Sequence, residues 1–193
     1  MARGTVTLAD LDALPTREAE PLLAACCGSP AWVRQMIERR PFGDVRSLLH
    51  AADQVWWSLS ADDWREAFAH HPRIGEREAK IAQEARARTW SAGEQRGVAD
   101  ASADLRAALA EGNRDYERRF GHIYLVSAAG KSAEELLAVL RARLSNDPET
   151  ELRVAAGEQA KITRLRLLKL LGAGDADGPT TSPAMPRPSP ILT

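Results

Sequence analysis

The chain contains 193 residues, 44% of them hydrophobic and 27% charged, and its formal net charge is −1. This length favours one domain with a real apolar core, since domains cluster near ~100–150 residues. The near-zero charge excludes a strong overall attraction to nucleic acid or to a membrane surface. No stretch approaches the ~20 apolar residues of a transmembrane helix.

Prolines, glycines and polar N-cap residues predict about eight helices. Pro21 is expected in the first turn of the first helix, which stops at Gly28. Ser29 followed by Pro30 marks the start of the second helix. The predicted helices occupy residues 16–27, 29–40, 44–59, 60–70, 76–88, 91–120, 132–144 and 147–171.

One segment between these helices, HIYLV at residues 122–126, has a β-like composition. It is too short and solitary to form a sheet, so we predict an extended, buried connector. Its backbone N–H and C=O groups would lack helical partners, and a polar ligand could supply them. After Leu171 the sequence becomes rich in proline and glycine. We therefore predict an all-α domain at residues 1–171 and a disordered tail at residues 172–193.

Two adjacent cysteines, Cys26 and Cys27, are the only ones in the sequence. Neighbouring cysteines rarely form a disulfide of good geometry, and two sulfurs without further ligands make no zinc site. We therefore expect no metal and a reducing, cytoplasmic compartment. The N-terminal residues also lack the apolar segment of a secretory signal.

Two adjacent histidines, His70 and His71, end the fourth predicted helix. Neighbouring side chains on a helix point about 100° apart, so the two imidazoles cannot easily share one task. His71 precedes Pro72, and a residue before proline is displaced from the helical region. We expect His71 at the helix exit, either as a functional group or as a surface or capping histidine, and the residues alone leave both open.

The segment SAGEQ at residues 91–95 has the pattern of a capping box, in which the side chains of Ser91 and Glu94 would accept backbone N–H groups at the start of a helix. Most such boxes are purely structural. A helix N-terminus also suits an anion or a polar ligand, to which Glu94 and Gln95 could add hydrogen bonds.

A further candidate group, Arg166, lies in the last predicted helix. We expect Ile162, Leu165, Leu168 and Leu171 to form its buried stripe, with Arg166 at the border of that stripe and Arg164 facing solvent. An arginine in such a place is more often a snorkelling surface residue than an anion clamp.

Six segments, taken in order, resemble the OHCU decarboxylase family, where OHCU is 2-oxo-4-hydroxy-4-carboxy-5-ureidoimidazoline, an intermediate of urate breakdown. The resemblance runs from about Leu8 to Leu171 and implies an all-helical bundle that converts OHCU to (S)-allantoin. It also implies that no cofactor is needed and that a homodimer can form. The six segments are RPF (40–42), HPRIGE (71–76), SAGEQ (91–95), YERRFGHIYLV (116–126), RLSND (143–147) and EQAKITRLRL (158–167).

The resemblance further implies the residues of the active site. His71 takes the place of the family's catalytic histidine before proline, and Glu94 and Arg166 are the other expected catalytic groups. His70 is then a neighbour that helps or is merely solvated. The residues expected to bind substrate are Pro72, Ser91, Gln95, His122, Ile123, Tyr124, Leu125 and Val126.

This chain departs from the family pattern at two places. Many members read Phe-Gly-Phe-Pro-Phe where this chain has Phe120-Gly121-His122-Ile123-Tyr124, which adds an imidazole and a phenol near the expected pocket. The family also often carries an acidic residue where Arg73 stands, so the role of that position is open.

The implied reaction loses CO₂ and then protonates the ring on one face. An imidazole with an ordinary pKa near 6.5 suits proton delivery, so we expect His71 to be the proton donor. Two other interpretations stay open. One is a non-catalytic helical module that binds a small polar purine-derived ligand. The other is a protein-interaction domain that presents arginine-rich helix faces.

Overall fold

The computed structural model describes residues 6–72, 103–128 and 130–173. Within these ranges all regular structure is helical, which confirms the predicted all-α class. No helix there combines the length and apolarity that crossing a bilayer would require. The helices are α1 (Leu8–Ala13), α2 (Thr16–Cys26), α3 (Pro30–Glu38), α4 (Val45–Ser58), α5 (Ala61–Ala69), α8 (Ala103–Phe120), α9 (Ala133–Arg143) and α10 (Pro148–Leu170).

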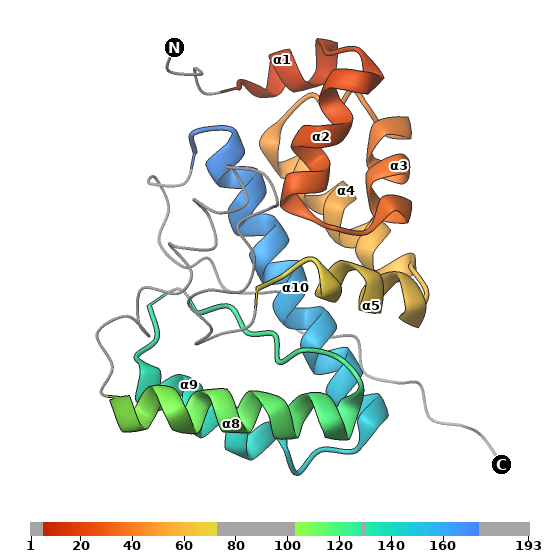
Figure 1. The fold of residues 1–193 in the computed structure, drawn as a ribbon. Coiled ribbons are helices and arrows are strands. Elements are labelled where there is room, and N and C mark those ends of the chain that lie inside the picture. Colours follow the sequence, from red (N-terminus) through yellow and green to blue (C-terminus); the bar gives the residue numbers. More distant parts are fainter. Residues whose placement is uncertain (1–5, 73–102, 129, 174–193) are drawn as a thin grey trace, which may run out of the picture.

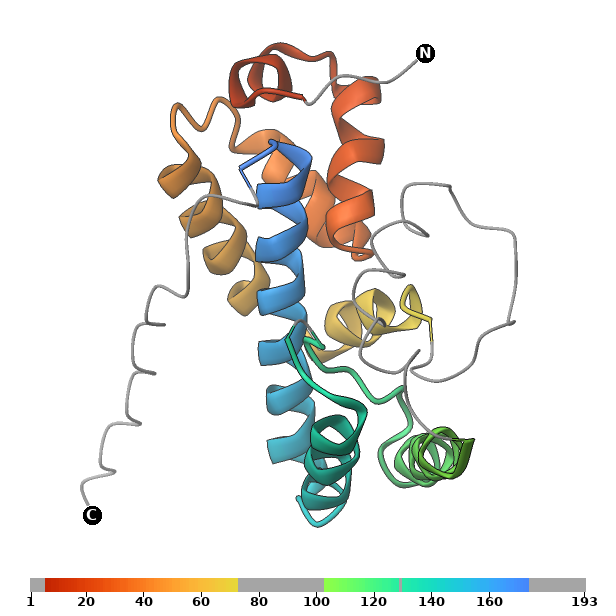
Figure 2. The same ribbon diagram turned by 90° about the vertical axis from the view of Figure 1, so that its left-hand side faces the viewer.

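The long helix α10 forms the axis of the molecule and contacts α2, α4, α5 and α8. In Figures 1 and 2, α1–α4 gather along its C-terminal half, and α8 and α9 pack together near its N-terminal end. Helix α5 lies between these two groups, beside the middle of α10. Residues from the N-terminal third and the C-terminal third of the chain therefore meet along one helix.

The core divides into two apolar clusters along this axis. The larger cluster joins α1–α5 to α10 and includes the fully buried Trp32 and Trp56. The indole N–H of Trp56 donates to the carbonyl oxygen of Ala156 at 2.9 Å, which fixes α4 against α10. The smaller cluster joins α8, α9 and the connector around Tyr116 and Tyr124. Leu125 of the connector belongs to the larger cluster and Val126 to the smaller one, so this short segment bridges the two.

Most helix starts follow the predicted polar caps. Ser29 accepts from the Trp32 N–H, with Pro30 as the first helical residue. Ser132 and Glu135 form a complete capping box at α9. Asp147 accepts from the N–H groups of Glu149 and Thr150 at α10, where Pro148 takes the first position. These side chains satisfy backbone donors that the helix itself leaves open.

Two details of the N-terminal region differ from the prediction. Helix α2 begins at Thr16, so Pro21 lies inside the helix and not in its first turn. The predicted start at residue 16 is confirmed, and only the placement of Pro21 in the first turn was wrong. Helix α1, a six-residue helix with a capping box formed by Thr7 and Asp10, was not predicted. The helix predicted at residues 76–88 and the start of the helix predicted at residue 91 lie outside the described residues.

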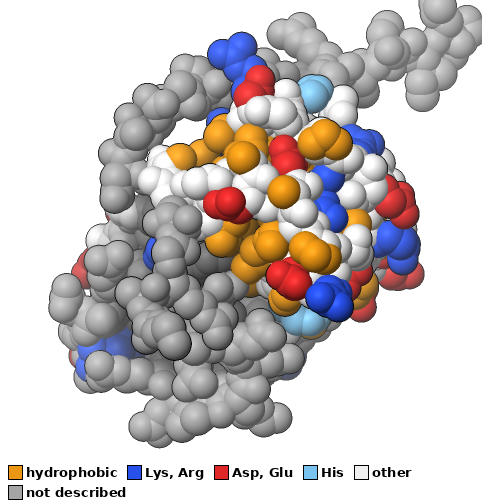
Figure 3. All heavy atoms as spheres, turned by 90° about the horizontal axis from the view of Figure 1, so that it is seen from above, with side chains coloured by type: hydrophobic (Ala, Val, Ile, Leu, Met, Phe, Trp, Pro, Cys, Tyr) orange, Lys and Arg blue, Asp and Glu red, His pale blue; other side chains and the backbone are white. Residues whose placement is uncertain are grey.

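The surface of the described residues mixes apolar and charged side chains. Figure 3, seen from above, shows hydrophobic groups with acidic and basic groups close around them. Among the described residues the large hydrophobic side chains that are more than a third exposed are Trp57, Val154 and Leu165. A few exposed apolar side chains are normal on a globular protein.

Candidate active site

The two histidines diverge at the exit of α5. His70 is the C-cap residue of this helix, and His71 follows it immediately before Pro72. The backbone N–H of His71 still donates to the Phe68 carbonyl oxygen at 3.0 Å. Proline then prevents a further helical turn. The predicted place of His71 at a helix exit is therefore confirmed.

His70 faces away from the interior. Its Nδ1 is 2.9 Å from the Glu66 carbonyl oxygen, so the imidazole donates back to its own helix. The residue is exposed, and its ring lies over the backbone of Gly28. A Cβ atom built on Gly28 would come within 2.5 Å of the His70 Cγ. His70 is thus a capping residue that packs on the turn between α2 and α3.

His71 turns inward and meets α10. Its Nδ1 lies 3.4 Å from Nη2 of Arg166, a residue 95 positions away in the sequence. A guanidinium can only donate hydrogen bonds, so Nδ1 of His71 must be the acceptor. The imidazole and the guanidinium predicted to share a site are therefore adjacent.

Arg166 is buried, with 7% of its surface exposed. Its side chain therefore does not extend to the solvent from the border of the buried stripe, as a snorkelling arginine would. The expected stripe was wrong in part: Ile162 is buried, but Leu165 is 44% exposed. Steps of three residues turn a helix by about 300°, so a stripe built from such steps drifts by about 60° each time. Alternating steps of three and four correct this drift. The buried face that results contains Gln159, Ile162, Thr163, Arg166, Leu167 and Leu170.

Burial and the neighbouring cation set the protonation state of His71. Desolvation, followed by the charge of Arg166, lowers the pKa of His71 from 6.5 to about 3. The expectation of an ordinary pKa was therefore wrong, because it assumed an imidazole in contact with water. At neutral pH the ring is uncharged, and with Nδ1 accepting, its proton resides on Nε2.

A buried glutamine, Gln159, also adjoins His71 and was not among the predicted site residues. Gln159 is fully buried on α10, and its side-chain N–H donates to Thr163 Oγ1 at 3.0 Å. Its hydrogen-bonding influence raises the pKa of His71 and partly opposes the effect of burial. Within the described part of the chain, Nε2 of His71 and Oε1 of Gln159 are both buried without a completed hydrogen bond. A single glutamine in a largely polar helix sequence gives no sign that its side chain is buried beside a histidine.

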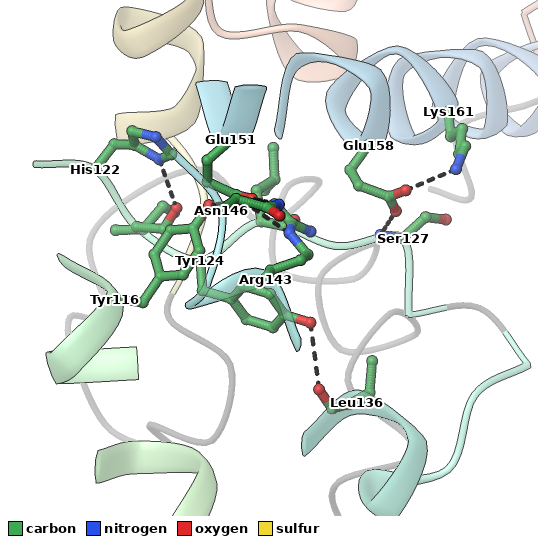
Figure 4. Close-up of polar contacts among 12 residues, drawn as sticks. Tyr116, His122, Tyr124, Ser127, Leu136, Arg143, Asn146, Glu151, Glu158 and Lys161 are labelled. Carbon is green, nitrogen blue, oxygen red and sulfur yellow. Dashed lines mark hydrogen bonds and ion pairs between the residues drawn. The ribbon is translucent and has the colours of Figure 1, made fainter. Parts of the chain in front are cut away.

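The connector is neither helix nor strand, and most of it is buried, as predicted. Residues 123–128 have no regular secondary structure, and Tyr124, Leu125 and Val126 are all buried. Side chains from two helices hold its backbone, as Figure 4 shows. Arg143 donates from Nη1 to the Leu125 carbonyl oxygen at 2.8 Å, and Glu158 accepts from the Ser127 N–H at 2.7 Å. Part of the polar backbone that we expected a ligand to satisfy is therefore satisfied by the protein.

Arg143 belongs to a buried polar network beneath the connector. Its Nε donates to Oε1 of Glu151 at 2.8 Å, and this glutamate has no exposed surface. The Tyr116 hydroxyl and the Asn146 amide also donate to Glu151. Burial raises the pKa of the Tyr116 phenol, which keeps it protonated as a donor. A fully hydrogen-bonded charge pair of this kind gives the connector a defined path.

His122, where this chain departs from the family pattern, packs its imidazole among aromatic side chains. Its ring packs 5.3 Å from Phe68 and 5.5 Å from Tyr116, measured between centroids. Burial lowers the pKa of His122, so an uncharged imidazole here replaces an apolar ring. The same residue lines a cleft of about 280 Å³ between α5, the end of α8 and the connector.

Three of the predicted site residues, Ser91, Glu94 and Gln95, lie outside the described residues, as does Arg73. Pro72 is exposed at the end of the described segment. Among the described residues no group of three or more His, Cys, Asp or Glu side chains could hold a metal ion. The polar groups that the structure does bring together are those of His71, Gln159, Thr163 and Arg166.

Comparisons with known proteins identify the family. The OHCU decarboxylase family model matches residues 12–168. The chain is 36% identical over 146 residues to the Arabidopsis thaliana "Uric acid degradation bifunctional protein TTL", covering 75% of this chain. It is 30% identical over 161 residues to the human "Putative 2-oxo-4-hydroxy-4-carboxy-5-ureidoimidazoline decarboxylase", covering 81% of this chain and 84% of that protein.

A solved structure agrees with these matches. The "Crystal structure of OHCU decarboxylase in the presence of (S)-allantoin" superposes with a TM-score of 0.67 at 34% identity, covering 77% of this chain and 96% of that one. The chain spans 45% of the length of the bifunctional Arabidopsis relative. By sequence and by fold, this chain belongs to the OHCU decarboxylase family.

Proposed function

We propose that this protein decarboxylates OHCU to (S)-allantoin in urate breakdown, without a cofactor. The observation that carries the proposal is the partly buried contact between His71 and Arg166, which places a neutral base beside a fixed cation. Family membership supports the choice of substrate. The related structure obtained in the presence of (S)-allantoin supports the choice of product.

The name of the substrate defines the chemistry. One ring carbon, C4, carries both the hydroxyl and the carboxyl group, and C5 carries the ureido group. When the bond from C4 to the carboxyl group breaks, its electron pair passes into the conjugated C=N bond, and this ring nitrogen takes a proton from solvent. The hydroxyl then loses its proton to become an oxo group, and C5 gains a proton. Proton delivery to one face of C5 gives a single enantiomer.

His71 is suited to carry that proton. Because its imidazole is neutral at pH 7, it cannot begin as an acid. It accepts the proton of the C4 hydroxyl at Nδ1 and then returns it to C5 as a general acid. The anionic substrate raises the proton affinity of the ring while it is bound, because a nearby negative charge favours imidazolium.

Arg166 and the connector hold the substrate. The planar guanidinium donates two parallel hydrogen bonds to the carboxylate or to the ureido carbonyl, a geometry that lysine cannot copy. Binding in this way draws Nη2 off Nδ1 of His71 and frees that nitrogen to react. Backbone groups of residues 122–126 bind the polar ring edge, and Pro72, Ser91, Glu94 and Gln95 complete the site.

The assay is stereochemical. Purified protein is added to freshly prepared products of urate oxidation, and circular dichroism follows the appearance of optically active allantoin. We expect faster decay of OHCU and an excess of the S enantiomer. Unchanged spontaneous decay to a racemate would reject the proposal and leave a non-catalytic binding module as the better description.

We also propose the assembly and setting of the protein. Residues 1–171 form the domain and residues 172–193 a tail, which the end of the family match at residue 168 supports. The buried free thiols of Cys26 and Cys27 support a reducing, cytoplasmic location. A homodimer is the proposed assembly, and light scattering measures its mass directly.

A further inference from the structure

Three polar side chains share the buried face of α10. Gln159, Thr163 and Arg166 are spaced four and three residues apart, which aligns them along one side of a helix. Their exposed fractions are 0%, 4% and 7%. Burying such groups costs free energy unless they find polar partners. Two of these partners are already identified, since Gln159 bonds to Thr163 and Arg166 to His71.

The orientation of the Gln159 amide follows from its neighbours. The Thr163 hydroxyl oxygen accepts the N–H of Gln159 at 3.0 Å. Burial raises the pKa of the adjacent Cys27 thiol, and the Thr163 side chain opposes part of this rise. With the amide nitrogen committed to Thr163, the Gln159 oxygen is left to face His71. A glutamine oxygen can only accept, and the neutral His71 ring has one N–H to offer.

We propose that Gln159 is a positioning residue for His71. Its carboxamide oxygen, held by Thr163, receives the Nε2–H of the imidazole and so directs Nδ1 toward the substrate. This inference rests on the proposed function for its catalytic consequence, but the tautomer of the ring can be tested without substrate.

The two unpartnered atoms give the proposal its structural basis. In the resting structure, Arg166 occupies Nδ1 through a long contact of 3.4 Å, and neither Nε2 nor the Gln159 oxygen has completed its hydrogen bond. When a substrate draws Arg166 away, the ring can settle toward Gln159. The remaining nitrogen then points where Arg166 was, which is where the substrate lies. A neutral amide in this role keeps the ring neutral, whereas a carboxylate would favour imidazolium.

The first test is spectroscopic. Long-range ¹H–¹⁵N spectra of the free protein at pH 7 report which imidazole nitrogen carries the proton. Among the described residues, the charged and titratable groups that act on His71 are Arg166 of α10 and His70 at the C-cap of α5. Arg166 also favours this tautomer through Nδ1, so the comparison is made in the Arg166→Leu background. For Arg166→Leu we expect the proton on Nε2 of His71, and for Arg166→Leu/Gln159→Leu a mixture of both tautomers. An unchanged Nε2–H tautomer in the double variant would overturn the proposal.

The second test is kinetic. Gln159→Leu should lower kcat by about 10²-fold, the order expected when a reacting group is misplaced by about 1 Å, while KM changes little. Thr163→Val, which removes the hydroxyl that orients the amide, should lower kcat in the same direction, and Thr163→Ser should restore it. Equal kcat in wild type and Gln159→Leu would also overturn the proposal. If the wild type shows no turnover at all, the proposed function fails, and the tautomer measurement still decides the role of Gln159.

Discussion

Arg143 and Glu151 form a buried ion pair that joins the last residue of α9 to the first turn of α10. The same guanidinium donates to the carbonyl oxygen of Leu125, so one side chain ties both helices to the connector. The Arg143–Glu151 ion pair therefore holds the connector backbone in place. This pair does not itself reach the group of His71 and Arg166, but it holds the connector, whose backbone we propose to bind substrate.

Removing one member of this pair should be costly. We expect Arg143→Met to lower the free energy of unfolding by about 3–5 kcal/mol, because it leaves the Glu151 carboxylate buried without its cation. Urea unfolding measures the loss. Arg141→Met, an exposed site on the same helix, is the matched control and should cost little. Converting both partners to apolar residues in Arg143→Met/Glu151→Leu should recover much of the stability. Equal stability of wild type and Arg143→Met would contradict this account.

The two histidines should differ in their effect on turnover. His71→Asn should reduce kcat by about 10²–10⁴-fold, the usual contribution of general acid–base catalysis. His70→Asn should reduce it far less, because His70 is exposed and bonds to its own helix. Steady-state kinetics with OHCU compares the two variants. A larger loss in the His70 variant would reverse the assignment.

Replacing Arg166 should lower kcat/KM even when the positive charge is kept. Arg166→Lys keeps the cation but loses the fork, so we expect kcat/KM to fall by about 10- to 100-fold, the equivalent of one or two charge-assisted hydrogen bonds. Arg164→Lys, two residues away on the exposed side of α10, is the control and should match wild type. Wild-type kinetics in Arg166→Lys would remove this residue from the site.

The low pKa of His71 predicts how stability depends on pH. In the unfolded chain the imidazole binds a proton near pH 6.5, but in the folded protein only near pH 3. Between these values the unfolded state holds the extra proton, so the free energy of unfolding should fall as pH falls, by up to about 1.4 kcal/mol per pH unit. The His71 contribution is fully present above pH 6.5.

Chemical unfolding at a series of pH values from 7 to 4 measures this slope. The slope should be smaller in His71→Gln than in wild type, and His50→Gln, at an exposed position of α4, should leave it unchanged. Parallel slopes in wild type and His71→Gln would show that burial does not hold this ring neutral.

Replacing Gly28 and Gly157 by alanine should change the stability of the protein in opposite directions. A Cβ at Gly28 would meet the His70 ring at 2.5 Å, so Gly28→Ala should destabilise the protein by about 1–3 kcal/mol, as overpacking does. The displaced end of α5 should also disturb His71 and slow turnover. Gly157, inside α10, has open space around it, and Gly157→Ala should stabilise by about 0.5–1 kcal/mol. Thermal unfolding of both variants checks the signs, and a gain from Gly28→Ala would contradict the packing described.

The sequence predicted what local chemistry controls. Polar caps such as Ser29 and Asp147 set helix starts through bonds within three residues, so their pattern is legible in the chain. The buried connector was also predicted, because its apolar run lies between glycines and helix signals. The six-residue α1 was missed because so short a helix leaves little periodic pattern around its Thr7 cap.

The site depended on information that local patterns do not hold. Neither residue type nor spacing pairs His71 with Arg166 across 95 positions, and only the family resemblance brought them together. The pKa of His71 is set by tertiary burial, so an isolated imidazole was the wrong reference. Gln159 was not predicted, because its importance depends on the buried atoms around its side chain and not on the residues next to it in the sequence.

The central position of α10 also bears on synthesis. During translation α2, α4 and α5 emerge before α10, the helix on which they pack. The indole of Trp56 can reach its partner, the Ala156 carbonyl oxygen, only after a hundred more residues have been made. The nascent chain therefore exposes an apolar surface until α10 is made, a stage at which large domains are prone to misassemble. The contact between His71 and Arg166, on which the proposed function rests, likewise forms only after α10 has been synthesised.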